Sequence, residues 1–391
     1  MQTDIATSPM RIGVVGCGML AAGVHIPNIA HHPHLRLEWL CDLDEARTRA
    51  LAEQHGATHV TTNYHDVLND PSVEMVLLAT THALRQEFII AAARKGKAVY
   101  VEKPMASSPR EIGQILKAVR ECQIPFCVGH NRRSAPATRD AVEILQRLRA
   151  NPQLTPWRLD RNSFLRPHLP EEEQTMVLLR INDDILSWKP WAFEEGIILA
   201  ETTHFCDLAN LFVGRAPRRI YATGTTRANF SMTIDYDDGS IATITGSAVG
   251  TLDYPKELIE ITAHGAMIAI DHLSEIRVRG IEGEPFRRTY PSPDPRVKSA
   301  NTGIEAFHDA AQQTIDERMQ GLSKEVFLGG PDKGHLAHLE RFARSIRGDG
   351  SSPCGELEGA KATIMTLKAI ESCRLGLPVH IGVEEYQIIA L

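Results

Sequence analysis

The sequence lacks the features that mark membrane proteins, secreted proteins and nucleic-acid-binding proteins. No apolar run in its 391 residues approaches the roughly 20 residues that a bilayer span needs. Residues 1–9 are polar and have no signal-peptide core, so we expect a loose leader there. The formal net charge is -7, and the sequence has no long run of charges of either sign. It therefore lacks the basic cluster that would bind the phosphate backbone of a nucleic acid. We therefore expect a cytoplasmic protein without a nucleic-acid or membrane partner.

Disulfide and metal signatures are missing as well. The seven cysteines form no C-x-x-C pair, which indicates reduced thiols and no zinc framework. His25, His31, His32 and His34 are spaced irregularly around Pro33 and do not share one helix face, so no metal site is expected. What remains is an ordinary globular composition, and its length predicts two domains.

The first part of the chain, residues 10–130, alternates short apolar runs with helical segments, which is typical of a doubly wound parallel sheet. Near-continuous hydrophobicity suits strands that are covered on both faces, predicted at Arg11–Val15, Leu35–Cys41, Met75–Ala79, Ala98–Glu102 and Phe126–Gly129. Helices are predicted over 44–55, 84–95 and 109–122. The fold class is α/β, with a Rossmann-like domain over 10–130.

The second part, residues 131–391, has a different order of predicted strands and helices. Consecutive strands are predicted over 220–225, 231–236, 241–245, 258–263, 267–271 and 275–279, with tight turns at Asp237-Asp238-Gly239 and His264-Gly265. Helices are expected at 305–319, 333–347 and 356–375, and long loops at 151–173 and 284–301. This pattern predicts an α+β domain with an open, mainly antiparallel sheet. The open face needs a cover, so we expect a homodimer or homotetramer through it.

A dinucleotide fingerprint directly follows the first predicted strand. Gly16-Cys17-Gly18-Met19-Leu20-Ala21 has the form G-x-G-x-x-A and lies between a strand and a helix. Gly16 permits the tight turn and Gly18 lets the backbone approach a pyrophosphate, which the helix N-terminus faces. Gly16, Gly18, Met19 and Leu20 are therefore expected to bind the cofactor.

Asp42 stands at the end of the second predicted strand, where a carboxylate can accept both hydrogen bonds of the adenosine ribose. Because a 2′-phosphate would meet this negative charge, Asp42 favours NAD over NADP. Arg47, one turn into the next helix, is either a phosphate contact or part of a solvated helix face.

Lys103 lies at the end of an apolar strand and precedes Pro104, which restricts its backbone to extended geometry. A lysine held in this way can polarise a substrate hydroxyl. The alternative is a strand-end lysine that only meets solvent.

Eight motifs follow one another nearly end to end: VVGCGMLA, CDLDEAR, ATTH, AVYVEKPMA, VGHNRR, GIILAETTHFCD, DDGS and ESCRLGLPV. In this order they resemble the Gfo/Idh/MocA family of nicotinamide-dependent sugar and cyclitol dehydrogenases. The resemblance implies that Lys103 lies beside the nicotinamide and hydrogen-bonds the reacting hydroxyl, while Thr80 and Thr81 line the cofactor groove. It also implies that His204 meets the substrate from the second domain as general acid/base.

The sequence departs from the family pattern in two places. Many relatives carry an aspartate four residues before the histidine, where Ala200 stands here; Glu201 either replaces that carboxylate in catalysis or is a structural partner. The usual proline-asparagine after the strand predicted at Met75–Ala79 reads Thr81-His82, and Arg85 replaces a nearby histidine. We expect His82, Arg85 and Glu102 among the cofactor contacts. Glu102 also stands next to the Lys103 ammonium, although alternation along the strand points its side chain to the opposite face.

Substrate contacts are expected from Lys103, His204, Arg132, Asn182, Trp188 and Trp191. An aromatic platform with polar neighbours fits the apolar faces and hydroxyl rim of a sugar-like ring. The alternatives are a salt bridge for Arg132, with Arg133 beside it, and a core or interface role for the tryptophans.

The predicted function is an NAD-dependent oxidoreductase that acts on a ring secondary alcohol of a sugar, sugar derivative or cyclitol. Such chemistry needs a hydride acceptor, a group that takes the hydroxyl proton, and stabilisation of the developing oxyanion. Two alternatives stay open: a non-redox glycoside-processing enzyme that keeps NAD bound, and a dinucleotide-binding regulatory protein.

Overall fold

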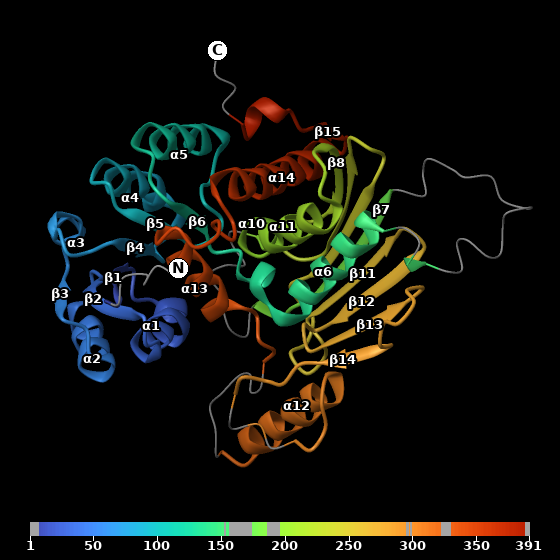
Figure 1. Cartoon of the computed structure of the whole chain (residues 1–391), viewed down its shortest axis with the longest axis horizontal. Coiled ribbons are helices and arrows are strands. Elements are labelled where there is room, and N and C mark those ends of the chain that lie inside the picture. The colour runs from blue at the N-terminus through green and yellow to red at the C-terminus, as the bar shows by residue number, and fades with distance from the viewer. Residues whose placement is uncertain are drawn as a thin grey trace, which may run out of the picture. The chain divides into compact units, whose positions relative to one another are not determined.

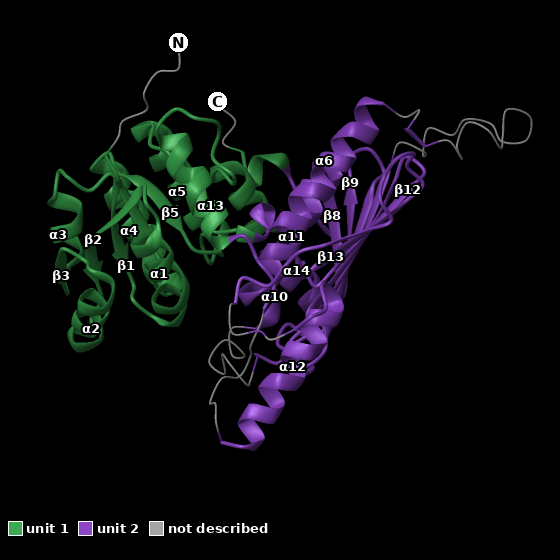
Figure 2. Cartoon of the chain, turned by 60° about the horizontal axis from the view of Figure 1, so that its bottom comes forward, with its two compact units in different colours: residues 1–131, 335–364, 383–391 green, residues 132–334, 365–382 purple. Residues whose placement is uncertain are grey.

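The computed structural model of the chain describes residues 8–151, 154–155, 174–185, 196–294, 297, 299–321 and 330–387. It consists of two compact units, each of which is described by itself (Figure 2). Unit 1 comprises the chain up to Asn131, His335–Ile364 and the chain from Val383, and unit 2 comprises Arg132–Gly334 and Met365–Gly382. The predicted domains, residues 10–130 and 131–391, differ from these units in that unit 1 also contains two later segments of the chain. The division into domains therefore stays a prediction.

Unit 1 contains a six-stranded parallel sheet in the order β3-β2-β1-β4-β5-β6, which confirms the α/β class (Figure 1). The strand order reverses between β1 and β4, and ligands of such sheets bind at the carboxyl ends of the strands near this point. The strands are β1 (Met10–Val15), β2 (Leu35–Cys41), β3 (His59–Thr61), β4 (Met75–Leu78), β5 (Ala98–Val101) and β6 (Phe126–Val128).

Helices connect these strands and begin at polar caps. Asp44 accepts a hydrogen bond from the Arg47 amide at the start of α2, and Ser108 accepts one from Glu111 at the start of α5, where Pro109 is the first helical residue. The helical segments of unit 1 are η1 (Ala21–His25), α1 (Ile26–His31), α2 (Glu45–His55), α3 (Tyr64–Asn69), α4 (His82–Arg94), α5 (Pro109–Cys122), α13 (His335–Ile346), the first part of α14 (Glu356–Leu375), and the turns η2 (Asn131–Ser134), which continues into unit 2, and η5 (Val383–Glu385).

Unit 2 contains a nine-stranded sheet in the order β14-β13-β12-β11-β7-β10-β9-β8-β15. Its pairs are antiparallel except for β10 and β7, which confirms a mainly antiparallel sheet. The predicted turns at Asp237–Gly239 and His264-Gly265 join β9 to β10 and β11 to β12. The strands are β7 (Thr175–Asn182), β8 (Pro217–Gly224), β9 (Phe230–Tyr236), β10 (Ile241–Ser247), β11 (Glu257–Ala263), β12 (Ala266–Asp271), β13 (Glu275–Arg279), β14 (Arg287–Thr289) and β15 (Val379–His380).

Helices α6 (Pro136–Ala150) and α11 (Thr202–Val213) pack on one face of this sheet, and the short α10 (Ile197–Ala200) leads into α11 (Figure 1). Helix α12 (Ile304–Met319) and the rest of α14 complete unit 2. On β7, Val177, Leu179 and Ile181 are buried, whereas Met176 and Leu178 between them are exposed. The strand register pairs Met176 with Ile241 on one side and with Thr262 on the other, and Thr262 in turn pairs with Met267. Exposed apolar side chains therefore share the sheet face opposite the buried residues of β7.

Candidate active site

The glycine-rich loop follows β1 in unit 1, and its two glycines stand there for different physical reasons. Gly16 has φ of 90°, and an added Cβ would lie 2.7 Å from the Ala79 carbonyl, so the backbone itself requires glycine there. A Cβ at Gly18 would meet nothing within 4 Å. Packing within the protein therefore does not require glycine at this position, whereas the close approach of a pyrophosphate would. Met19 and Leu20 are exposed beside the loop.

The Asp42 side chain is hydrogen-bonded to the backbone of this loop. Its Oδ2 accepts a hydrogen bond from the Cys17 amide at 2.7 Å, and its Oδ1 accepts from the Asp44 amide at 3.0 Å and from Arg47 Nη2 at 3.1 Å. Burial acts to raise the pKa of the Asp42 carboxyl, but these hydrogen bonds and the Arg47 charge lower it. An ionised carboxylate at the end of β2 suits a ribose. Arg47 Nη2 lies next to this carboxylate while the Arg47 side chain is 45% exposed, so both interpretations of Arg47 stay predictions.

Two residues after β4 have different roles: Thr80 is a candidate cofactor contact, and Arg85 links two backbone segments. Thr80 Oγ1 is buried and has no hydrogen-bond partner among the described residues, which suits a group that would bond a cofactor. Arg85 is buried; its Nε and Nη2 donate to the Thr80 carbonyl at 3.2 and 3.0 Å, and its Nη1 donates to the Pro104 carbonyl. Arg85 thus joins the segments that follow β4 and β5. Thr81 and His82 lie at the start of α4.

Lys103 follows β5 and is partly exposed, and its peptide bond to Pro104 is cis. The neighbouring Glu102 is 4% exposed, and its Oε1 lies 2.7 Å from His25 Nε2. This pairing was not foreseen, because in the sequence His25 belonged to an irregular group of histidines.

In unit 2, His204 lies in the first turn of α11 and is buried; its amide donates to the Glu201 carbonyl at 3.2 Å. Glu201 stands at the junction of α10 and α11. Its Oε2 lies 3.7 Å from Lys256 Nζ and 4.0 Å from Arg132 Nη2. The structure therefore brings Glu201 and Arg132 together within unit 2 and adds Lys256 to them.

Arg132 itself forms a bidentate ion pair with Glu257, and Lys256 Nζ lies 2.6 Å from Asp183 Oδ2. Burial acts to raise the pKa of the Glu257 carboxyl, but the charge and hydrogen bond of Arg132 lower it to about 2. Burial, with the charges of Lys256 and Arg132 nearby, lowers the pKa of Lys333 to about 8. Sequence reasoning missed Lys256, Glu257 and Lys333, since each belongs to no motif.

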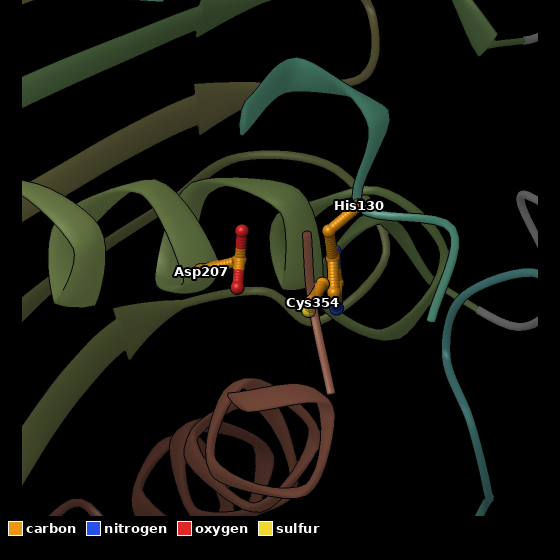
Figure 3. Close-up of side chains that lie close together, drawn as sticks. All are labelled: His130, Asp207 and Cys354. Carbon is orange, nitrogen blue, oxygen red and sulfur yellow. The ribbon is translucent and has the colours of Figure 1, made fainter. Parts of the chain in front are cut away.

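Arg133 forms a salt bridge within unit 2, in which its Nε donates to Asp207 Oδ2 at 2.6 Å. Figure 3 shows Asp207 projecting from α11. The same view draws His130 and Cys354, both of unit 1, whose potential ligand atoms lie within 4.8 Å of each other. Both of these side chains are buried.

Asn182 is not brought together with His204. Its Nδ2 donates to the carbonyls of Thr251 and Tyr254 at 2.8 and 3.3 Å, and its Oδ1 accepts from the Thr251 amide. It lines a hollow of about 600 Å³ on the open face of the sheet, whereas α11 packs on the opposite face. Alternation along β7 explains this, because Ile181 points into the core. Trp188 and Trp191 lie outside the described residues.

A further set of potential metal ligands, Glu38, His59 and Asp70, brings its atoms within 4.8 Å at one edge of the unit 1 sheet. Glu38 Oε2 already lies 3.3 Å from Arg36 Nε and 3.6 Å from Arg11 Nη1. Because two guanidinium groups neutralise this carboxylate, the cluster has the character of a protein ion pair.

Comparison with known proteins agrees with the fold and the loop. Residues 10–130 match the model of the GFO_IDH_MocA family, described as an oxidoreductase family with an NAD-binding Rossmann fold. The uncharacterised oxidoreductase YrbE of Bacillus subtilis is 25% identical over 386 residues, which cover 96% of this chain and 97% of YrbE. Myo-inositol 2-dehydrogenase of Thermotoga maritima is 23% identical over 350 residues, covering 85% of this chain and 95% of that enzyme.

Among solved structures, the WlbA dehydrogenase from Chromobacterium violaceum in complex with NADH and UDP-GlcNAcA has a TM-score of 0.70 and 19% identity, and 97% of each chain is covered. Within the described part of the chain, each helix is too short or too polar to span a bilayer. The dinucleotide loop, the sheet order and the family match together identify residues 10–130 as an NAD-binding Rossmann fold of the Gfo/Idh/MocA oxidoreductase type.

Proposed function

We propose that the protein is an NAD-dependent oxidoreductase that moves hydride between a ring secondary alcohol of a sugar, sugar derivative or cyclitol and nicotinamide. The observation that carries this proposal is the contact of Asp42 with the glycine-rich loop, through the Cys17 amide at 2.7 Å. It holds an ionised ribose acceptor against a loop whose Gly18 has open space around it. The names of the Thermotoga maritima relative and of the WlbA complex support the substrate class.

NAD is the preferred cofactor in this proposal, and Gly16, Gly18, Met19, Leu20, Asp42, Thr80, Thr81 and His82 are its binding residues. Bound NAD would supply the hydride acceptor. The Thr80 hydroxyl and the Asp42 carboxylate orient it, while a 2′-phosphate would bring negative charge onto Asp42. Arg85 acts indirectly, since its Nε, Nη1 and Nη2 each donate to one of two backbone carbonyls.

Proton handling is assigned to Lys103 and His204. The Lys103 ammonium hydrogen-bonds the reacting hydroxyl and stabilises negative charge on its oxygen, and the His204 imidazole takes the proton. Glu201 supplies the carboxylate that Ala200 lacks. The two cations near Glu201 Oε2, at 3.7 and 4.0 Å, favour its ionised form and so favour a protonated His204 after the transfer.

The open face of the unit 2 sheet is proposed to bind a second copy of the chain. Met176, Leu178, Tyr221, Ile241 and Met267 are exposed on it. Met176, Ile241 and Met267 lie on neighbouring strands, and exposed apolar side chains that cluster in this way mark interaction surfaces. A homodimer or homotetramer through this face would cover it.

The proposed function is tested with a panel of inositols and sugars, each offered with NAD and with NADP, while NADH or NADPH absorbance is followed. The proposal expects NADH in large stoichiometric excess over enzyme with at least one cyclitol or sugar. Reduced cofactor that never exceeds one equivalent per subunit with any substrate, although the cofactor binds, would contradict it.

A further inference from the structure

The His25–Glu102 contact joins two parts of unit 1 that the sequence keeps 77 residues apart. His25 is fully buried at the end of η1, a π-helical turn in which the Ile26 amide donates to the Ala21 carbonyl. Met19 to His31 form one helical run that starts directly after Gly18. A π-helical turn inserts an extra residue and so changes the face on which the following side chains lie, and such turns are frequent at functional sites.

Glu102 is the acceptor in this contact. Burial acts to raise the pKa of its carboxyl, but the hydrogen bond from His25 and the charges of His25, His335 and Lys103 lower it to about 2. An ionised carboxylate can only accept, so His25 Nε2 carries the proton and donates it. A buried carboxylate without this donor would lose a charge-assisted hydrogen bond.

The carboxylate is enclosed on its other sides. A Cβ added at Gly129, just after β6, would lie 2.8 Å from Glu102 Oε1 and 3.0 Å from its Cδ, so only glycine leaves room for it. The His25 ring meets Tyr100 of β5 and His335 of α13 edge-on, with centroids 5.6 and 6.3 Å apart. The pair thus has one well-defined position between the loop helix, β5 and α13.

Glu102 immediately precedes Lys103, and the carbonyl of Pro104 on the other side is bound by Arg85 Nη1. The backbone of Lys103 is therefore fixed from both neighbours. On one side the anchor is His25, which belongs to the helix that begins at the dinucleotide loop. Movement of that helix when a dinucleotide binds would be transmitted to Lys103 through a single hydrogen bond.

We propose that His25 is a positioning residue for Lys103: its hydrogen bond to Glu102 couples occupation of the glycine-rich loop to the placement of the Lys103 ammonium. This inference rests on the proposed function, which gives Lys103 its chemical task. It assigns to the contact a role beyond that of a buried ion pair that only stabilises unit 1.

The test measures the reactivity of Lys103 in the full chain. The protein is labelled with acetic anhydride over a range of pH, with and without NADH as the probe, and acetylation of Lys103 is quantified by peptide mass spectrometry. In the wild type, NADH is expected to change the Lys103 labelling rate about tenfold, the effect of one pKa unit on the free-amine fraction. Binding of NADH is measured in parallel by fluorescence titration.

The informative variants are His25→Leu and His25→Gln, because the glutamine amide can take the place of the Nε2 donor. His25→Leu should bind NADH but lose the NADH-dependent change at Lys103, and His25→Gln should restore most of it. His31→Leu, on the same helical run, is the matched control, since His31 is exposed and its Nδ1 bonds the Pro27 carbonyl at 2.7 Å; it should behave as the wild type. If His25→Leu does not fold, His25→Leu with Glu102→Leu removes the buried carboxylate together with its donor and tests the same loss.

The outcomes separate the two claims. An NADH-dependent change at Lys103 that is equal in wild type and in a folded His25→Leu, or absent in His25→Gln, overturns the role of His25 and leaves the proposed function standing. Lys103 labelling in the wild type that does not respond to bound NADH also overturns the coupling, whereas NADH that does not bind at all in the fluorescence titration counts against the proposed function itself.

Discussion

Arg132 and Glu257 form a bidentate ion pair in which Arg132 Nε lies 2.9 and 3.0 Å from the two carboxylate oxygens and Nη2 lies 2.6 Å from Oε1. Neither residue is more than 4% exposed. The arginine that the sequence nominated for substrate binding is therefore largely occupied by a carboxylate of its own unit. Its charge still faces Glu201, so it shapes the proposed site as a fixed cation.

Glu257→Gln should destabilise the protein strongly, because it removes the carboxylate that forms the bidentate pair with the buried Arg132 guanidinium and leaves only the more distant Glu201 charge named above. Breaking a buried pair in this way costs about 3–5 kcal/mol. Urea unfolding measures the loss. Asp235→Asn, which breaks the exposed pair with Arg219, is the control and should cost less than about 1 kcal/mol. Equal, small effects in both variants would show that the Arg132 pair is not the buried pair described.

The stability of the protein should fall in mild acid because of His272. Burial, with the charge of Lys333 nearby, lowers the pKa of His272 from 6.5 to about 3, and its Nδ1 accepts a hydrogen bond from the Lys256 amide at 3.0 Å. Between these pH values the unfolded chain binds a proton that the folded chain does not, so stability decreases as pH falls below 6.5. At pH 5 the loss from this group is about 2 kcal/mol relative to neutral pH.

His272→Asn tests this assignment, because asparagine keeps an acceptor near Nδ1 and tolerates the φ of 51° at this position but does not titrate. Unfolding free energies at pH 7.5 and pH 5 are compared by urea titration. The pH-dependent loss should be smaller in His272→Asn by about the same 2 kcal/mol. An unchanged loss would assign it to other groups, such as Glu257, whose own contribution is lost only below about pH 4.5, between that value and about pH 2.

Removing the Asp42 carboxylate should change the choice of cofactor. Asp42→Ser takes away the ribose acceptor and the partner of Arg47, so affinity for NADH should fall about tenfold, as expected for one lost hydrogen bond to a charged group. NADPH should bind more tightly than to the wild type, because Arg47 is then available for the 2′-phosphate. Fluorescence titrations with both cofactors measure this. Arg47→Ala added to Asp42→Ser should abolish the gain; a gain that survives it would exclude Arg47.

Glu201→Gln tests whether this residue replaces the carboxylate missing at Ala200. The amide keeps the shape but cannot stabilise a protonated His204, so turnover should fall about 100-fold, within the range for general acid-base catalysis. NADH affinity should stay unchanged, since Glu201 belongs to unit 2. Turnover within a factor of two of the wild type would make Glu201 a purely structural partner of Lys256 and Arg132.

Most of the fold could be predicted from the sequence, because hydrophobic periodicity and stop signals are local features of the chain. β2, β13, α5 and α14 have the predicted bounds, since clear start or stop signals bound each of them in the sequence. β3 and α3 were missed because a three-residue strand and a six-residue helix carry too little periodicity. β7 was missed because its alternating pattern, buried at Val177 and exposed at Leu178, lay inside a segment judged only by its polar motifs.

The candidate site was accessible only where a motif marks the backbone. Gly16, Gly18 and Asp42 follow from the turn and the strand end that they serve. The ion pairs of Lys256 and Glu257 and the His25–Glu102 contact join residues far apart in the sequence, and only their burial in the folded chain makes these side chains partners. Asn182 shows the converse, because one residue along β7 decides which face of the sheet a side chain reaches.

Lys103→Met tests the central claim most directly, because it removes the ammonium but keeps an unbranched side chain of similar length. The measurement is NADH formation from NAD and the reactive sugar or cyclitol, with NADH binding titrated in the same preparation. The account predicts that Lys103→Met binds NADH as the wild type does and forms no NADH above one equivalent per subunit. Turnover by Lys103→Met at the wild-type rate would contradict it.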